Sequence, residues 1–240
     1  MKVVILAAGR GTRMGEITIR VPKPMLPVAG VPAIERVILA AKRQGFAEFV
    51  VVTGYLGEQV RGHLGVGEAL GVSLSCVQQE QQTGTASALL ITREQVGNSD
   101  LLLCFADIMT SPENYSRMRR RFAEERCDVT AALRQVDDPW RAAAVYVDGE
   151  MNIERLIEKP AKGTSTTPWA HAGMYCFRPS IFDYLEQVKP SPRAEYEVVD
   201  AVSAMIADGK RVRGVELTGY WKDLATPEDI AQAARMVQNG

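Results

Sequence analysis

Short apolar runs alternate with amphipathic segments along the first half of this chain, and this alternation restricts the fold more than any other feature. Four runs have the length and the β-branched or leucine-rich composition of buried strands: Val3–Ala8, Phe49–Thr53, Ser73–Gln78 and Leu101–Phe105. Between them, Ala33–Gln44 and Thr85–Glu94 have the pattern of helices. Strands that alternate with helices form parallel sheets through right-handed crossovers, so the sequence predicts an α/β fold.

The second half contains more strands and fewer helices. The expected strands are Val129–Gln135, Ala142–Asp148, Ile153–Glu158 and His171–Phe177, and the expected helices are Pro179–Val188, Val198–Asp208 and Pro227–Gln238. Strands that follow one another without a helix favour antiparallel pairing, so we expect a mixed sheet. No repeat and no Ser/Gly-rich linker interrupts the 240 residues, which favours one domain over residues 1–240.

Composition excludes two classes of partner. The 28 Lys and Arg residues are balanced by 29 Asp and Glu, so the net charge of −1 argues against nucleic acid or an anionic membrane as the main partner. The apolar runs are six residues long at most, far below the roughly 20 that a membrane-spanning helix needs. We therefore expect neither a nucleic-acid nor a membrane protein.

Two further features indicate a cytoplasmic protein. The N-terminal apolar run is shorter than the apolar region of a signal peptide and leads directly into a glycine-rich turn, so it is interpreted as a strand. The four cysteines lack C-x-x-C spacing, which predicts reduced thiols, mostly in the core, rather than a metal site.

A glycine-rich turn follows the first strand. Gly9 and Gly11 would let the backbone approach phosphate oxygens at the carboxyl end of the sheet. The turn is not a dinucleotide fingerprint, because Met14 stands where a third glycine is required, and no Walker A sequence follows. By itself the turn could equally be a plain strand-to-helix connection. Further along, Lys23 lies between two prolines that stiffen the backbone, which suits an ammonium group held against a fixed anion.

Taken together, L-A-A-G-x-G-T-R-M from Leu6 to Met14 and P-K-P-M-L-P from Pro22 to Pro27 resemble the signature of the sugar-1-phosphate nucleotidyltransferases, the nucleoside-diphosphate-sugar pyrophosphorylases. Motifs of this family follow in family order as far as Asp229. The resemblance implies a Rossmann-like, three-layer α/β/α domain with a mostly parallel, mixed central sheet, the glycosyltransferase-A-like nucleotidyltransferase fold. It also implies a nucleotide-binding half over about residues 1–110 and a sugar-phosphate-binding half over about residues 111–240.

The resemblance implies a Mg²⁺-dependent transfer of a nucleoside monophosphate from a nucleoside triphosphate to a sugar 1-phosphate, with release of pyrophosphate. A phosphate oxygen is already an anion, so such an in-line displacement needs no covalent intermediate and no general base. Arg13 and Lys23 would stabilise the charge at the α-phosphate. The nucleotide site would consist of Leu6, Ala8, Gly9, Gly11, Thr12, Gln79, Gln82, Gly84 and Thr85.

The base would be recognised by the segment from Gln79 to Ala86, which is similar to the family's Q-x-x-Q-x-G-T. A glutamine amide offers a donor and an acceptor together, which matches the N3–H and carbonyl edge of uracil or thymine. We therefore expect UTP or dTTP as the donor. On its residues alone the segment could equally be a polar entry loop to a helix.

Magnesium would be held by two aspartates. Asp107 follows an apolar strand, at the position of the family's Gly-Asp pair, with Ala106 in place of glycine. Asp223 lies in W-K-D-L-A-T-P-E-D, similar to the family's W-x-D-x-G-T-P-E-D, with Ala225 in place of glycine. Either aspartate alone could be a cap or turn residue, but two carboxylates with phosphates and waters suit octahedral Mg²⁺.

The sugar phosphate would be bound by residues of the second half. These lie in motifs that resemble the family's E-K-P, N-x-G-x-Y and R-G-E-x-E-I-T-D, and they are Glu158, Lys159, His171, Gly173, Arg193 and Glu197. His171 replaces the family's asparagine, and Gly15–Thr18 differs from the family's P-L-T. The run from Arg119 to Arg121 is expected to form a solvated helix face.

Two alternatives remain open. One is a cytidylyl- or guanylyltransferase that acts on another phosphorylated acceptor. The other is a catalytically silent regulatory subunit that binds a nucleotide sugar, although the retention of Arg13, Lys23, Asp107 and Asp223 argues against it. Because the matching motifs end in the last predicted helix, we expect a minimal catalytic unit of unknown oligomeric state.

Overall fold

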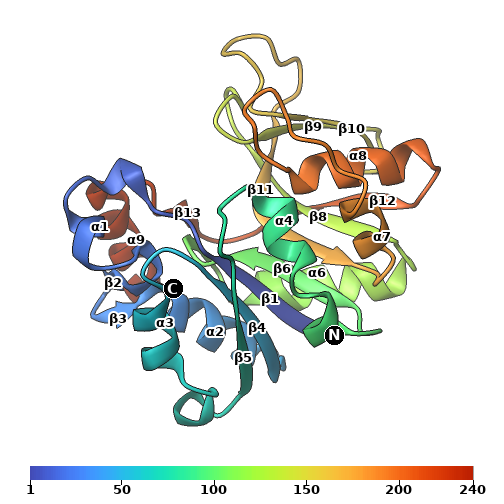
Figure 1. The fold of residues 1–240 in the computed structure, drawn as a ribbon. Coiled ribbons are helices and arrows are strands. Elements are labelled where there is room, and N and C mark those ends of the chain that lie inside the picture. The colour runs from blue at the N-terminus through green and yellow to red at the C-terminus, as the bar shows by residue number, and fades with distance from the viewer. Residues whose placement is uncertain (240) are drawn as a thin grey trace.

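The molecule is built around one sheet of nine strands. The computed structural model, which describes residues 1–239, gives these strands as β1 (Lys2–Ala7), β4 (Glu48–Thr53), β5 (Ser73–Gln78), β6 (Leu101–Phe105), β8 (Val129–Gln135), β9 (Ala143–Val147), β10 (Ile153–Glu158), β11 (Trp169–Phe177) and β12 (Val212–Glu216). Their order is β10-β9-β11-β6-β1-β4-β5, and β8 pairs with β11 and with β12 (Figure 1). The predicted strands are confirmed, four of them with the same bounds.

The two halves of the sheet differ in strand direction, as the order of elements predicts. Strands β6, β1, β4 and β5 run parallel. Strand β11 pairs antiparallel with β6, β8 and β9, and β9 pairs antiparallel with β10. The carboxyl ends of β1 and β6 and the amino end of β11 therefore meet at one edge of the sheet, where the site described below is found.

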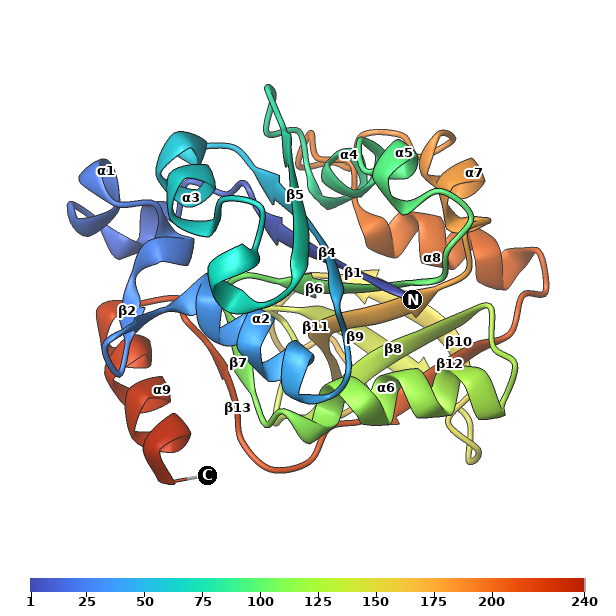
Figure 2. The ribbon, with the colours of Figure 1, turned by 90° about the horizontal axis from the view of Figure 1, so that it is seen from below.

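Helices cover both faces of the sheet. Their bounds are α1 (Ile17–Arg20), α2 (Ala33–Arg43), α3 (Gly57–Leu64), α4 (Thr85–Leu90), α5 (Arg93–Val96), α6 (Glu113–Glu124), α7 (Ile181–Leu185), α8 (Val198–Ala207) and α9 (Pro227–Asn239). Strand β1 shows why two layers are needed: Val3 and Ile5 pack into a core with α2, α3, α6 and α9, whereas Val4 and Leu6 pack into a second core with α4, α5, α7 and α8. Figure 2 shows α2 and α6 on one side of the sheet and α4, α5, α7 and α8 on the other. The predicted three-layer α/β fold is confirmed.

Three predicted helices, α2, α8 and α9, agree with the observed bounds to within one residue, and two differ by more. The segment Thr85–Glu94 forms α4 and α5 rather than one helix, because the buried Thr92 turns its hydroxyl back onto the carbonyl oxygen of Leu89 at 2.7 Å and closes the end of α4. Helix α7 covers only the middle of the predicted Pro179–Val188. Helix α9 is capped by Thr226: the amide of Asp229 donates to the Thr226 hydroxyl, and the amide of Thr226 donates to the Asp229 carboxylate.

Two short strand pairs lie outside the main sheet. Strands β2 (Pro27–Val28) and β3 (Val31–Pro32) form a small hairpin. Strands β7 (Ile108–Thr110) and β13 (Trp221–Asp223) pair antiparallel, with Ile108 opposite Asp223. This second pair brings a segment near the end of the chain beside the end of β6.

The expectation for the arginine run is wrong for Arg119. Its guanidinium stacks on the ring of Phe46 at 4.7 Å and donates to the carbonyl oxygen of Gln44 at 2.9 Å. Arg119 therefore joins α6 to the end of α2. Arg121 is half exposed and pairs with Glu125 along the same helix.

The cysteine prediction is confirmed in the described chain. All four cysteines are free, and Cys104, Cys127 and Cys176 are buried. Within residues 1–239, no helix has the length and apolar composition that a membrane span requires.

Candidate active site

The glycine-rich turn leaves β1 at the carboxyl edge of the sheet and folds into a short 3-10 turn at Thr12–Met14. Gly11 has a φ of 66°, and a Cβ on it would lie 3.0 Å from the Cβ of Lys23. Thr18 closes the turn by donating its hydroxyl to the carbonyl oxygen of Gly11 at 3.1 Å. Met14, at the position that excluded a dinucleotide fingerprint, is buried in the core. The turn is thus anchored at Met14 and packed closely against Lys23.

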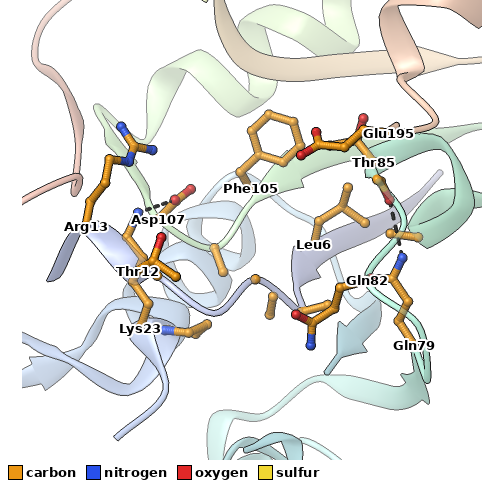
Figure 3. A pocket seen from close by; sticks show the side chains of 18 of the residues that line it. Leu6, Thr12, Arg13, Lys23, Gln79, Gln82, Thr85, Phe105, Asp107 and Glu195 are labelled. Carbon is orange, nitrogen blue, oxygen red and sulfur yellow. Dashed lines mark hydrogen bonds and ion pairs between the residues drawn. The ribbon is translucent and has the colours of Figure 1, made fainter. Parts of the chain in front are cut away.

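A cavity of about 390 Å³ opens above this turn (Figure 3). All nine residues of the predicted nucleotide site line it, together with Arg13, Lys23 and Asp107. Seven further residues complete the lining: Ala7, Pro24, Ala88, Phe105, Ala106, Glu195 and Ala225. The structure therefore brings together four segments of the first half that the motifs single out.

Lys23 lies between the two predicted metal ligands. Its Nζ is 2.5 Å from Oδ2 of Asp107 and 3.9 Å from Oδ1 of Asp223, and its side chain is only 9% exposed. The two carboxylates come together because β13 pairs with β7, directly after Asp107, and because the amide of Leu224 donates to the carbonyl oxygen of Asp107 at 2.9 Å. Two carboxylates far apart in sequence thus face one ammonium group at the rim of the cavity.

The charges of Lys23, Asp107 and Asp223 favour the binding of a further cation beside the two carboxylates. Burial and the neighbouring charge of Asp107 raise the pKa of Asp223, although Lys23 and Arg13 act in the opposite direction. Within residues 1–239, no three His, Cys, Asp or Glu side chains converge as a metal cluster. Two carboxylates without a third protein ligand fit Mg²⁺, which usually keeps several waters and takes its other oxygens from substrate phosphates.

The cavity wall that is predicted to bind the base is formed by the loop before α4. Gln79 is buried, and its amide nitrogen donates to Oγ of Ser87 at 3.1 Å and to the carbonyl oxygen of Gly84 at 3.3 Å. Gln82 is exposed and lies at the cavity wall (Figure 3). The internal bonds hold the Gln79 amide in one orientation, so that its carbonyl oxygen remains as the acceptor for a ligand.

Arg193 forms ion pairs with several carboxylates in and beside the predicted sugar-phosphate site. It pairs with Glu197, with Glu158 at 3.5 Å and with Glu195 at 3.7 Å. Glu197 also accepts a hydrogen bond from Thr85 at 3.5 Å. Because Thr85 and Glu195 both line the cavity, this cluster adjoins the predicted nucleotide site.

Glu158 and Lys159 stand at the edge of the cluster. Burial and the charge of Glu197 raise the pKa of Glu158, against the opposing effect of Lys159 and Arg193. The Lys159 ammonium is half exposed, 3.9 Å from Glu158, and its backbone has a φ of 43°. The exposed Lys159 is therefore open to a ligand phosphate, whereas Arg193 is already surrounded by acids.

His171 and Gly173 lie in a bulge of β11 instead of lining the cavity. The pairing of β11 with β8 is interrupted between His171 and Tyr175. His171 Nε2 faces the carbonyl oxygen of Met174 at 3.2 Å, and Nδ1 faces the amide of Gly173 at 3.4 Å. Burial lowers the pKa of His171 to about 4. A neutral ring with both nitrogens engaged supports the bulge, and a contact between His171 and a sugar stays a prediction.

Phe105 and Glu195 are lining residues that the sequence analysis did not single out. Phe105 ends β6 and turns its ring into the cavity (Figure 3). Glu195 lies inside the motif that provided Arg193 and Glu197. Phe105 ends a strand two residues before Asp107, and this position could have identified it from the sequence as a residue that lines the cavity.

Comparison with known proteins agrees with this geometry. A family model described as nucleotidyl transferase matches residues 2–240. The chain is 34% identical to the low-salt glycan biosynthesis nucleotidyltransferase Agl11 of Haloferax volcanii, over 99% of this chain and 66% of Agl11. It is 31% identical to the UTP–glucose-1-phosphate uridylyltransferase AglF of the same organism, over 99% of this chain and 97% of AglF.

A solved structure is similar over its whole length. It is a Bacillus anthracis protein described as a candidate glucose-1-phosphate thymidylyltransferase, in complex with sucrose. The TM-score is 0.90 at 27% identity, and the match covers 100% of this chain and 96% of the other. Several curated relatives are longer, and the chain spans between 53% and 66% of their length.

Proposed function

Because this chain belongs to the nucleotidyl transferase family, we propose that it joins a nucleoside triphosphate to a sugar 1-phosphate and forms a nucleoside-diphosphate sugar and pyrophosphate. One arrangement above all supports this: a buried ammonium, Lys23, between two carboxylates at the rim of a cavity lined by a glycine-rich turn. Such a centre can neutralise a triphosphate and orient its α-phosphate for in-line attack.

The residues of the first half would bind and polarise the nucleotide. Amides of the turn at Gly9–Thr12 approach the phosphates, and Arg13 and Lys23 stabilise the charge that develops at the α-phosphate. Asp107 and Asp223 would hold Mg²⁺, which, when bound, neutralises phosphate charge and helps to orient the leaving pyrophosphate.

The second half would bind the attacking sugar 1-phosphate. Lys159 offers a half-exposed ammonium for the phosphate, and Glu158 and Glu197 offer acceptors for sugar hydroxyls. A carboxylate that accepts from two hydroxyls fixes the ring and leaves the anionic phosphate oxygen as the nucleophile. Arg193 would hold Glu158 and Glu197 in place.

We propose UTP or dTTP as the preferred donor. The oriented amide of Gln79, with Gln82 beside it, supports a pyrimidine that carries a proton at N3. Uridylyl and thymidylyl transfer are also the activities named for AglF and for the Bacillus anthracis protein. The four free cysteines agree with a cytoplasmic enzyme, because disulfides are rare in that compartment.

A pyrophosphate-release screen that crosses the five common triphosphates with a panel of sugar 1-phosphates tests the proposal. We expect turnover with UTP or dTTP and a hexose 1-phosphate, and none in the presence of a chelator. Turnover only with CTP or GTP and another phosphorylated acceptor would replace the assigned substrates. Tight binding of a nucleotide sugar without turnover of any pair would identify a regulatory subunit.

The metal assignment has its own test. Asp107→Asn and Asp223→Asn each remove one charged ligand from a partly exposed position, so we expect turnover to be nearly abolished while the protein stays folded, with some loss of stability because Lys23 loses a charged partner. Asp137→Asn, in an exposed loop, is the matched control and should behave as the wild type. Normal rates in either of the first two variants would refute the assignment.

A further inference from the structure

Arg134 is a half-buried cation that the proposed mechanism does not use. It is the penultimate residue of β8, and it faces the same side of the sheet as Ala132, which packs in the core with α2 and α6. Its guanidinium carbon lies 3.9 Å from the centre of the Trp221 ring. Of the cation–aromatic pairs in the described chain, this one has the shortest separation.

No acidic partner accounts for the burial of this side chain. In the part of the chain that the structure describes, no carboxylate oxygen lies within 4 Å of Arg134, and its Nε is buried without a hydrogen-bond partner. A buried arginine is normally paired with an acid. The cation–π contact with the Trp221 ring is therefore the main interaction that holds the guanidinium at this position.

Trp221 is held at a second point. Its indole N–H donates to the carbonyl oxygen of Ala172 in β11 at 2.9 Å. The ring is thus fixed between Arg134 of β8 and the backbone of β11, so that β13 is anchored to the main sheet through one side chain. Among residues 1–239, β7 is the one strand that pairs with the three residues of β13.

Asp223 depends on this anchor. Trp221 and Asp223 are two residues apart in a strand, so their side chains lie on the same face. Lys222, on the opposite face, pairs with Asp229 at 2.5 Å and fixes the other side of the strand. The charge of Asp223 also acts on Arg134: burial lowers the pKa of Arg134, and Asp223 partly offsets this.

We propose that Arg134 is a positioning residue for Asp223: by stacking on Trp221 it fixes strand β13 and thereby the distance between Asp223 and Asp107. The proposal rests on the role of Asp223 in the function proposed above. It differs from a role in substrate binding, because Arg134 does not line the cavity. Loss of the stack should loosen β13 and misplace one of the two carboxylates.

The kinetics of single and double variants test whether Arg134 affects turnover through its contact with Trp221. Arg134→Met keeps a long apolar stem and loses the flat cation, and we expect kcat to fall about 10- to 100-fold, the range found when a residue that orients a metal ligand is removed, with little change in KM. Arg134→Lys should recover part of the loss, since it restores a cation but not the planar stack. Arg155→Met removes a similar stack, 4.1 Å from Tyr146 on the far strands β9 and β10, and should leave kcat unchanged.

The double variant distinguishes positioning from direct action. If Arg134 acts through the indole, Arg134→Met combined with Trp221→Leu should be no slower than Trp221→Leu alone. Effects that multiply, or a raised KM for the sugar 1-phosphate at unchanged kcat, would overturn the proposal. If Trp221→Leu fails to fold, Trp221→Met, which also lacks the aromatic ring, takes its place in the same cycle.

Hydrogen exchange gives a readout that does not depend on turnover. Arg134→Met should speed the exchange of the Leu224 amide, which bonds to Asp107, whereas Arg155→Met should not. Unchanged exchange in Arg134→Met would overturn the proposal. A wild-type protein that turns over no substrate pair would refute the proposed function instead, while the exchange comparison would still decide whether Arg134 fixes β13.

Discussion

Lys23 is the most buried charged side chain in the cavity wall, and its neighbours explain why it tolerates burial. The residue is 8% exposed, and two carboxylates offset the loss of its hydration. A triphosphate would bring further negative charge to the same ammonium. In the proposed reaction, Lys23 would therefore stabilise negative charge that develops at the α-phosphate.

We expect Lys23→Ala to lower kcat by about two orders of magnitude or more, corresponding to the 2.7–4 kcal/mol lost when a preorganised charge stabiliser is removed. Steady-state kinetics with varied triphosphate measure this. A variant with normal kcat and only a raised KM for the triphosphate would show that Lys23 contributes uniform binding, and the assigned role would be wrong.

The lowered pKa of His171 leads to a separate prediction about how the free energy of unfolding depends on pH. Its pKa is about 4 in the folded protein and near 6.5 when exposed, so between these values the unfolded chain binds a proton that the folded chain does not. The stabilising effect of the neutral ring is complete above about pH 6.5 and is lost as the pH falls towards 4.

Between pH 7 and pH 5 this linkage should cost the wild type about 2 kcal/mol of unfolding free energy. His171→Asn removes the titrating group, so its stability should fall less over the same interval. Urea unfolding of both proteins at the two pH values measures the difference. Parallel losses in both proteins would mean that His171 does not titrate in this range.

Residues in local motifs were predictable, and residues placed by tertiary pairing were not. Gln79, Gly84 and Thr85 lie within one short segment that resembles a family motif, and this resemblance assigned them to one predicted site. The internal hydrogen bonds of His171 depend on a bulge in β11, which no local pattern encodes. The histidine in place of the family's asparagine at position 171 therefore indicates that the site differs from the family pattern, but the sequence does not show how the His171 ring is oriented.

At the scale of elements, the loop before α4 and the segment before α8 are joined backbone to backbone. The amide of Tyr196 donates to the carbonyl oxygen of Thr83, and the amide of Ala86 donates to that of Tyr196, both at 2.8 Å. A Cβ on Gly84, which has a φ of 129°, would lie 2.6 Å from the Tyr196 nitrogen. This junction requires glycine both for its conformation and for its close approach.

Gly84→Ala should separate these two segments, destabilise the protein by at least about 1–3 kcal/mol and weaken nucleotide binding. Gly97→Ala is the matched control, because Gly97 also has a positive φ, of 60°, but has open space where the Cβ would lie. Thermal unfolding and nucleotide titration compare the two variants. Equal effects in both would mean that backbone conformation alone, and not contact with Tyr196, requires a glycine at position 84.

Among the elements that the sequence analysis missed, β7, β13 and α3 are short, whereas β12 is a strand of the main sheet that was missed as well. Strands β7 and β13 have three residues each, too few for a recognisable period, and they form only by pairing with one another. Helix α3 follows Leu56, whose φ of 51° is unusual for a branched residue, and no cap side chain signals its start. The long buried strands needed no such partner information, because continuous apolar runs identify them.

At the scale of the molecule, ligands that bridge the cavity wall should stabilise the folded state. A nucleotide that contacts the turn after β1 and the loop before α4 links parts that separate on unfolding. At a concentration 100 times its Kd it adds about 2.7 kcal/mol to the unfolding free energy, or about 5–10 °C in Tm for a chain of this size.

Differential scanning fluorimetry with Mg²⁺ and equal concentrations of each triphosphate measures this effect. We expect the largest rise in Tm with UTP or dTTP and smaller rises with ATP, GTP and CTP, in keeping with the amide of Gln79. The largest rise with a purine triphosphate would contradict the proposed base site, even if the protein were a transferase.

The pairing of β13 with β7 has a consequence for the order in which the parts of the site are synthesised on the ribosome. Strands β1, β4, β5 and β6 leave the exit tunnel early and carry the turn, the base loop and Asp107. Asp223 follows only after β12 has been synthesised. A nascent chain therefore contains most of the residues of the predicted nucleotide site well before Asp223, the second predicted metal ligand, has been synthesised.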